Sequence, residues 1–123
     1  MFVTSQGGVY AQFRRALRGR HIIAAWGLAA ELPQVSLADA LELLLLACEL
    51  EPARFDRGVP RWHARLCAQR QLSASEAQLA LAALNALAGR GAVSGAEALA
   101  SICARHGLDA ETRALEGWLR RHD

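Results

Sequence analysis

The sequence predicts an all-α protein of about seven helices, packed as stacked antiparallel hairpins in either an irregular helical bundle or a short α-solenoid. Two observations favour this fold class. Apolar residues recur at spacings of three and four through most of the 123-residue chain, which is the period of an amphipathic helix. In addition, no segment alternates apolar and polar residues between turn dipeptides, as the strand of a β-hairpin would.

Residues 36–51 predict the helix around which the others pack. Their apolar side chains cover most of the helical circumference, and only Asp39, Glu42 and Glu49 mark a polar edge. A helix that is apolar on most sides must be covered by more than one neighbour. Its longest uninterrupted apolar run, residues 43–48, is far shorter than the roughly 20 residues that a membrane span needs. We therefore expect a central helix and no membrane association.

The first third of the chain predicts two further helices. We expect residues 1–8, which are small, polar and end in glycine, to form a flexible leader, and residues 9–123 to form a single helical domain. The first helix then begins at residue 9 and ends near Gly19. The second begins near His21 and ends before Pro33.

Proline, glycine and capping residues indicate where the later helices begin. Residues 53–70 contain Gly58 and Pro60, which predict a short turn followed by a helix that begins at Pro60. Ser and Asp residues that can cap a helix, two of them followed three residues later by Glu, predict three more helix starts. These residues are Ser73, Ser94 and Asp109.

The spacing of the predicted caps resembles that of helical repeats. Ser36, Ser73 and Asp109 are 37 and then 36 residues apart. Paired helices at this period over about residues 37–108 resemble tetratricopeptide and HEAT-type repeats, although the Trp, Leu-Gly and Tyr of the tetratricopeptide signature are absent. The Leu-Pro, Glu-Pro and Arg-Trp elements of residues 32–67 also resemble small all-α proteins of GC-rich bacteria, a resemblance that implies no known activity.

Composition restricts the compartment and the kinds of partner. All 14 basic side chains are Arg, which is typical of a GC-rich genome, and the net charge of +2 is too small to imply a polyanionic partner by itself. Cys48, Cys67 and Cys103 are an odd and widely spaced set, which argues against a disulfide framework and suits a reducing compartment. Because the N-terminus has no signal-peptide pattern, we expect the protein to be cytoplasmic.

The sequence offers little support for catalysis or for a cofactor. It contains no nucleophile elbow, no glycine-rich phosphate loop and no His-Glu-x-x-His motif. The one metal alternative is a Cys₂His₂ zinc set made of His63 with Cys67 and Cys103 with His106, because each pair would share one helix surface. Small core cysteines and surface histidines explain the same residues. We therefore expect neither an enzyme nor a bound cofactor.

Arginines are the candidate binding residues. Arg57, Arg61 and Arg65 recur at helical spacing, although Gly58 and Pro60 are expected to interrupt the helix and scatter them. A second group lies on the first helix: Arg14, Arg15 and Arg18. Arginine is common in interfaces because its planar guanidinium binds carboxylates in a forked geometry and stacks on aromatic rings.

The leading functional hypothesis is therefore a small helical protein–protein interaction or adaptor module. Its partner is another protein, or a second copy of the chain. Self-association would use the apolar face made by Ala77, Leu81, Leu84 and Ala88. The alternative is an accessory protein that binds nucleic acid through the same arginines.

Overall fold

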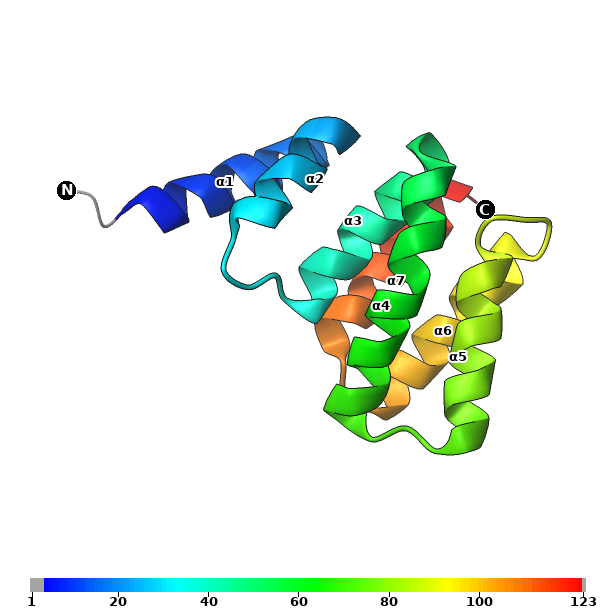
Figure 1. The fold of residues 1–123 in the computed structure, drawn as a ribbon. Helices are drawn as coiled ribbons and strands as arrows, with labels where there is room; N and C mark the ends of the chain where they lie inside the picture. The colour runs from blue at the N-terminus through cyan, green and yellow to red at the C-terminus, as the bar shows by residue number, and fades with distance from the viewer. Residues whose placement is uncertain (1–3, 123) are drawn as a thin grey trace.

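The computed structural model describes residues 4–122 and folds them into seven α-helices (Figure 1). The all-α prediction and the expected number of helices are confirmed, and residues 4–122 contain no β-strand. The helices are α1 (Thr4–Arg18), α2 (Ile22–Glu31), α3 (Leu37–Leu50), α4 (Pro52–Arg70), α5 (Ala74–Ala86), α6 (Ala92–Arg105) and α7 (Asp109–His122).

The last five helices form a closed bundle. Each helix from α3 to α6 packs against the helix that follows it, and α7 packs back against α3. In an open helical repeat each unit contacts only its neighbours in sequence, so the contact between α3 and α7 distinguishes this bundle from a solenoid. The α1–α2 hairpin stands apart from the five-helix body, and its backbone approaches only α3 (Figure 1).

Helix α3 occupies the centre of the fold, as its sequence predicts. It packs against α1, α2, α4 and α7, and the four consecutive leucines at residues 43–46, which point to different sides of the helix, are each at most 8 % exposed. The buried indole Nε1 of Trp62 on α4 donates a hydrogen bond of 2.9 Å to the carbonyl oxygen of Leu37 at the first turn of α3. This bond fixes α4 along the side of α3.

Two of the four predicted caps are confirmed and two are wrong. The Ser36 side chain accepts a hydrogen bond from the backbone N–H of Asp39, and Ser73 forms a complete capping box with Glu76. Ser94, in contrast, lies inside α6, which begins at Ala92 after the turn at residues 89–91. Asp109 is the first residue of α7 rather than the residue before it.

The first helix begins earlier than the sequence indicates. α1 starts at Thr4, so helix replaces the expected leader from Thr4 to Gly8, and Met1 to Val3 lie outside the described residues. Gly7 and Gly8 lack an apolar side chain and therefore hide this part of the helix from a search for apolar periodicity. In the part of the chain that the structure describes, no helix has the length and apolar character needed to cross a membrane.

The predicted break in α4 is also wrong, because the helix runs through both Gly58 and Pro60 without interruption. Pro60 cannot donate a hydrogen bond to the carbonyl group of Asp56, but both residues are exposed, so water can bind that carbonyl instead. Gly58 has a packing role. A Cβ atom at Gly58 would lie 2.7 Å from the Cδ1 atom of Leu44, so the glycine allows α4 to approach α3 closely.

A similar close approach at Gly95 gives a test of the packing between α5 and α6. A Cβ atom at Gly95 would lie 2.6 Å from the backbone oxygen of Ala83, which cannot move aside as a side chain can. We expect Gly95→Ala to destabilise the protein by about 1–3 kcal/mol through overpacking. Gly27→Ala is the matched control, since nothing lies within 4 Å of the position that a Cβ atom would take at this residue of α2. It should stabilise the protein by about 0.5–1 kcal/mol through helix propensity. Urea unfolding of both variants measures the difference, and equal stabilities would contradict the proposed close packing.

Candidate functional site

A groove runs between α2 and α4 with α3 at its base. Both helices pack against α3, but their backbones do not approach each other, and this leaves a cavity of about 190 Å³. We refer to it as the α2–α4 groove. Its lining consists of Trp26, Ala40, Leu43, Leu44, Arg57, Gly58, Arg61, Trp62 and Arg65. Apolar side chains from three helices thus form the floor, and three arginines of α4 form one wall.

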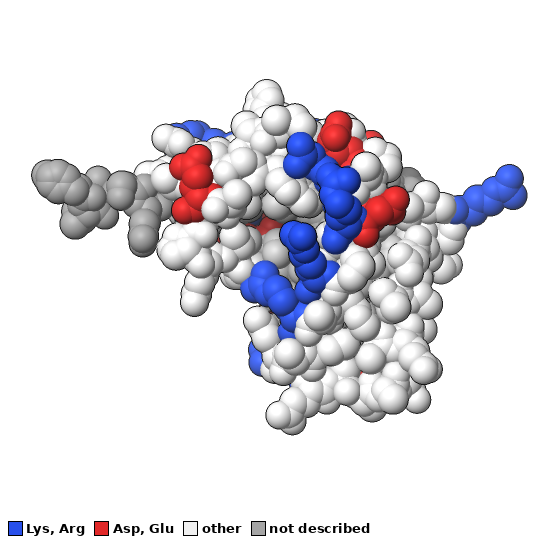
Figure 2. All heavy atoms as spheres, in the orientation of Figure 1, with Lys and Arg blue, Asp and Glu red and all other residues white. Residues whose placement is uncertain are grey.

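The continuity of α4 brings these arginines together. Arg57, Arg61 and Arg65 are spaced by four residues, so an unbroken helix places them on one face. A helix interrupted at Pro60 would separate Arg57 from the other two. Figure 2 shows arginine side chains gathered beside a hollow on the face that α4 presents, with acidic residues near the margin.

The four arginines on this side of α4 differ in their contacts. Arg65 Nη2 donates a hydrogen bond of 2.7 Å to the backbone oxygen of Val35, and the Arg54 guanidinium lies 5.5 Å from the ring centroid of Trp26. Arg57 and Arg61 are exposed and make no hydrogen bond or ion pair with any residue in the described range 4–122. The groove therefore carries two guanidinium groups that are available to a ligand.

Arg14 has a structural role. Its Nη1 lies 2.8 Å from Asp39 Oδ1 and 3.1 Å from Glu42 Oε2, so it joins α1 to the polar edge of α3. Asp39 is buried, and its hydrogen bond with the hydroxyl of Tyr10 raises the pKa of that tyrosine above its ordinary value. Because two carboxylates already bind Arg14, it is a poor candidate for a contact with a partner.

The two predicted arginine groups do not form one continuous patch. Arg18 lines a different cleft, whose α3 residues lie on the side of that helix opposite to Leu43 and Leu44. Arg15 is exposed and has no ion-pair partner among residues 4–122. Of the six predicted binding residues, the structure therefore brings together Arg57, Arg61 and Arg65 and separates them from those on α1.

The four residues of the zinc alternative do not converge. His63 Nε2 lies 2.7 Å from the backbone oxygen of Ala77, and because a carbonyl oxygen only accepts, this nitrogen carries the proton. The Sγ atom of Cys67 lies 3.5 Å from the same nitrogen. Cys103 is completely buried. Within residues 4–122, no group of three or more His, Cys, Asp or Glu side chains is arranged to hold a metal ion.

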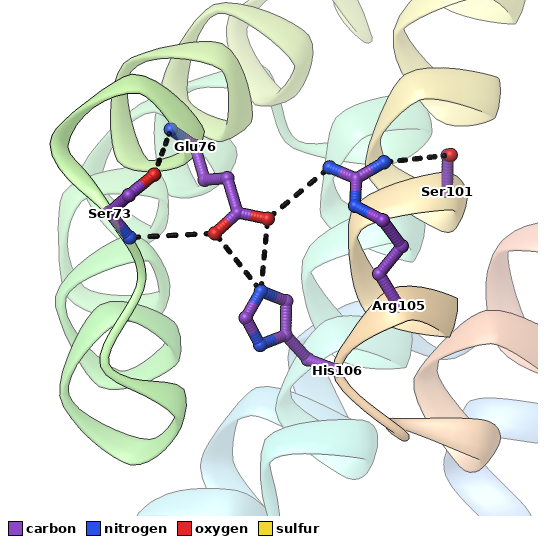
Figure 3. Close-up of polar contacts among 5 residues, drawn as sticks. All are labelled: Ser73, Glu76, Ser101, Arg105 and His106. Carbon is purple, nitrogen blue, oxygen red and sulfur yellow. Dashed lines mark hydrogen bonds and ion pairs between the residues drawn. The ribbon is translucent and has the colours of Figure 1, made fainter.

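His106 instead belongs to a polar cluster that joins α5 to α6 (Figure 3). Its Nε2 lies 3.1 Å from both carboxylate oxygens of Glu76, and Arg105 Nη2 lies 3.3 Å from one of them. The same carboxylate accepts a hydrogen bond of 3.4 Å from the backbone N–H of Ser73. Glu76 therefore completes the cap of α5 and fixes the C-terminal end of α6 at the same time.

The cysteines have the environment of structural residues. Burial raises the pKa of the Cys103 thiol to about 12 and that of Cys48 to about 11, so both stay protonated near neutral pH. The Cys67 thiol lies 3.5 Å from Nε2 and 4.0 Å from Nδ1 of His63, and Nε2 also donates to the backbone oxygen of Ala77.

Burial distinguishes the three tryptophans from one another and changes the expectation about the apolar face of α5. Trp62 and Trp118 are core residues, 3 % and 2 % exposed, but Trp26 is only half-buried and lines the α2–α4 groove. On α5, Leu84 is completely buried and unavailable for self-association, whereas Leu81 is 37 % exposed. Amphipathic spacing alone does not separate these cases, because each residue lies on an apolar face of its own helix.

Comparisons of the chain with models of protein families, with curated proteins and with solved structures found no match.

The Glu76 cluster predicts a contribution to stability that depends on pH. The hydrogen bond from His106 holds the pKa of Glu76 below its ordinary value of 4.5. A carboxylate with a lowered pKa stabilises the folded state above its unfolded pKa, and this contribution is lost as the pH falls through the folded pKa. Glu76→Gln should therefore be less stable than the wild type at neutral pH, and the two should converge as the pH falls below 4.5.

Urea unfolding midpoints recorded from neutral pH down to about pH 3 measure this convergence. Glu97→Gln serves as the control, because Glu97 is exposed on α6 and has no partner among the described residues. Its midpoints should run parallel to those of the wild type. A constant gap between Glu76→Gln and the wild type at every pH would show that the Glu76 carboxylate has no such role.

Proposed function

We propose that this protein is a non-catalytic helical interaction module that binds another protein through the α2–α4 groove. The partner segment would carry an apolar side chain with acidic residues beside it. The observation that carries the proposal is the pair of exposed guanidinium groups, Arg57 and Arg61, which have no internal partner within residues 4–122 and stand beside an apolar floor.

The polar wall of the groove suits carboxylates. Arginine binds a carboxylate through two parallel N–H···O hydrogen bonds. An arginine is most available to a partner's carboxylate where no acid of the same protein already binds its guanidinium. Arg14 illustrates the competing case, because Asp39 and Glu42 occupy its guanidinium. Arg57 and Arg61 have no such ion pairs among the described residues. A partner's Asp or Glu can therefore form two hydrogen bonds with either guanidinium without breaking a hydrogen bond within the protein.

The floor of the groove suits an apolar anchor. Trp26, Leu43 and Leu44 form part of the lining, and the Trp26 ring is already held in place by the Arg54 guanidinium 5.5 Å from its centroid. Protein interfaces commonly combine a buried aromatic or aliphatic anchor with surrounding polar contacts. A cavity of about 190 Å³ accommodates one or two side chains of a partner rather than a whole drug-sized ligand.

The alternative function is nucleic-acid binding through the same arginines. The free charges of Arg57 and Arg61 would favour it, because phosphate contacts depend mainly on arginine and lysine. Against it, Glu51 lies 3.7 Å from Arg54 at one end of the wall, and the arginines of α1 lie on another side of α3. A basic stripe that follows a phosphate backbone would need those groups to be continuous.

The proposal also includes the cytoplasm as the compartment. Cys48, Cys67 and Cys103 are all free, which suits a reducing environment. A module whose function is binding needs no activated nucleophile, which is consistent with the raised thiol pKa values of Cys48 and Cys103.

Site-specific photo-crosslinking in extracts of the source cells tests the proposal. Ala64 is exposed on α4 beside the arginine wall, and a benzophenone amino acid at this position should crosslink to a protein. The double change Arg57→Glu and Arg61→Glu should abolish the product, because both carboxylate-binding groups are reversed in charge. The double change Arg90→Glu and Arg120→Glu alters the net charge equally at exposed positions outside the groove, and it should leave the product unchanged.

The remaining outcomes distinguish the alternatives. A crosslinked product that nuclease treatment removes, and whose yield falls steeply with added salt, would replace the proposal with nucleic-acid binding. A product that both double variants reduce equally would indicate attraction by net charge rather than use of the groove. If position 64 gives the same crosslinks as the same amino acid at Ala104, an exposed residue of α6, the groove is not the binding surface.

A further inference from the structure

A second and larger cleft lies on the other side of α3, between α1 and α7. Both helices pack against α3 without approaching each other, and the space between them has a volume of about 530 Å³. We refer to it as the α1–α7 cleft. It shares no residue with the α2–α4 groove. Pockets that bind small molecules typically have volumes of about 300–1,000 Å³.

The wall of the cleft that α7 provides combines small residues with two arginines. Ala110, Ala114 and Gly117 lie on the face of α7 that lines it, together with Arg113 and Arg121. The two arginines are eight residues apart, which is about 12 Å along a helix. Arg121 Nη1 lies 3.7 Å from the position of a Cβ atom at Gly117, so its guanidinium folds back over the floor.

Both acids within the cleft already have a partner inside the protein. Glu42 lies 3.1 Å from Arg14, and Glu49 lies 2.8 Å from Arg20 and 3.5 Å from His122. The guanidinium groups that remain come from both walls, Arg18 from α1 and Arg113 and Arg121 from α7. None of these three has an ion-pair partner within residues 4–122. The cleft therefore presents an excess of positive charge to a ligand.

We propose that the α1–α7 cleft binds a small organic anion. The apolar body of the ligand lies over Leu17, Leu45 and Leu46, and its carboxylate, sulfonate or phosphate group is held by the guanidinium groups of Arg113 and Arg121. Arg18 on the opposite wall takes a second negative charge where the ligand carries one. Because the cleft is separate, the proposal does not depend on the function assigned to the α2–α4 groove.

Two fluorescent probes that differ in one charged group test this proposal. Anilinonaphthalene sulfonate has an aromatic body and a sulfonate, and N-phenyl-1-naphthylamine has the same body without the sulfonate. We expect the sulfonate to bind about tenfold more tightly or better, because only it forms charge-assisted hydrogen bonds with the arginines. Backbone NMR should show the largest shifts at Ala114 and Gly117 in the floor of the cleft.

Matched variants identify the groups responsible. Arg113→Gln with Arg121→Gln should weaken binding of the sulfonate about tenfold and leave the neutral probe unaffected. Arg57→Gln with Arg61→Gln removes the same two charges from the other groove and should change neither affinity. Ala114→Leu fills the floor of the cleft and should weaken binding of both probes even though all the arginines remain.

Three results would overturn the proposal. Equal affinity of the two probes would show that the arginines do not hold the anion. NMR shifts centred on Trp26 or Leu43 would place the probe in the α2–α4 groove instead. Unchanged binding by Arg113→Gln with Arg121→Gln, in a variant whose circular dichroism matches that of the wild type, would exclude the assigned residues.

Discussion

The fold depends on covering one helix that is apolar on nearly all sides. Residues 43–47 of α3 are all buried. Because these consecutive residues point to all sides of the helix, any side of α3 left in contact with water would expose a leucine. Burial of a Leu side chain is worth about 1.5–3 kcal/mol, so each uncovered side of α3 would cost a large part of a typical domain's stability. Four helices, α1, α2, α4 and α7, meet this requirement.

The packing of four helices around α3 also explains where the two clefts lie. Neighbouring helices pack with axes about 8–10 Å apart, and helices placed on opposite flanks of α3 do not meet one another. The backbones of α2 and α4 stay apart on one side, and those of α1 and α7 stay apart on the other. Gly58 lines the α2–α4 groove and Gly117 lines the α1–α7 cleft, and neither residue has a side chain that would fill the space. Arginines occupy the rims because their long stems cover apolar surface while the guanidinium groups remain in water.

The sequence predicts the helices well and the site only in part, and particular residues explain why. Ser36 and Ser73 are predicted correctly because a capping bond involves residues only three apart. Pro60 is predicted wrongly because contacts between helices outweigh local preference, as in the packing of Gly58 on Leu44. Ser94 is predicted wrongly because α6 begins directly after the turn that ends at Gly91. The separation of Arg14 from Arg57 depends on which carboxylate lies across a helix interface, and periodicity along one chain carries no information about that pairing.

The α1–α2 hairpin contributes one wall to each cleft, since α1 lines one and α2 the other. It is joined to the body mainly through α3, by the ion pairs of Arg14 and Arg20 and by its apolar contacts, and Trp26 also lies beside Arg54 and Gly58 of α4. Partial unfolding of such a peripheral unit costs less free energy than global unfolding. When the hairpin detaches, both clefts lose a wall together. An occupant of either cleft would hold the hairpin in place and so preserve the other cleft, which links the two affinities thermodynamically although the clefts share no residue.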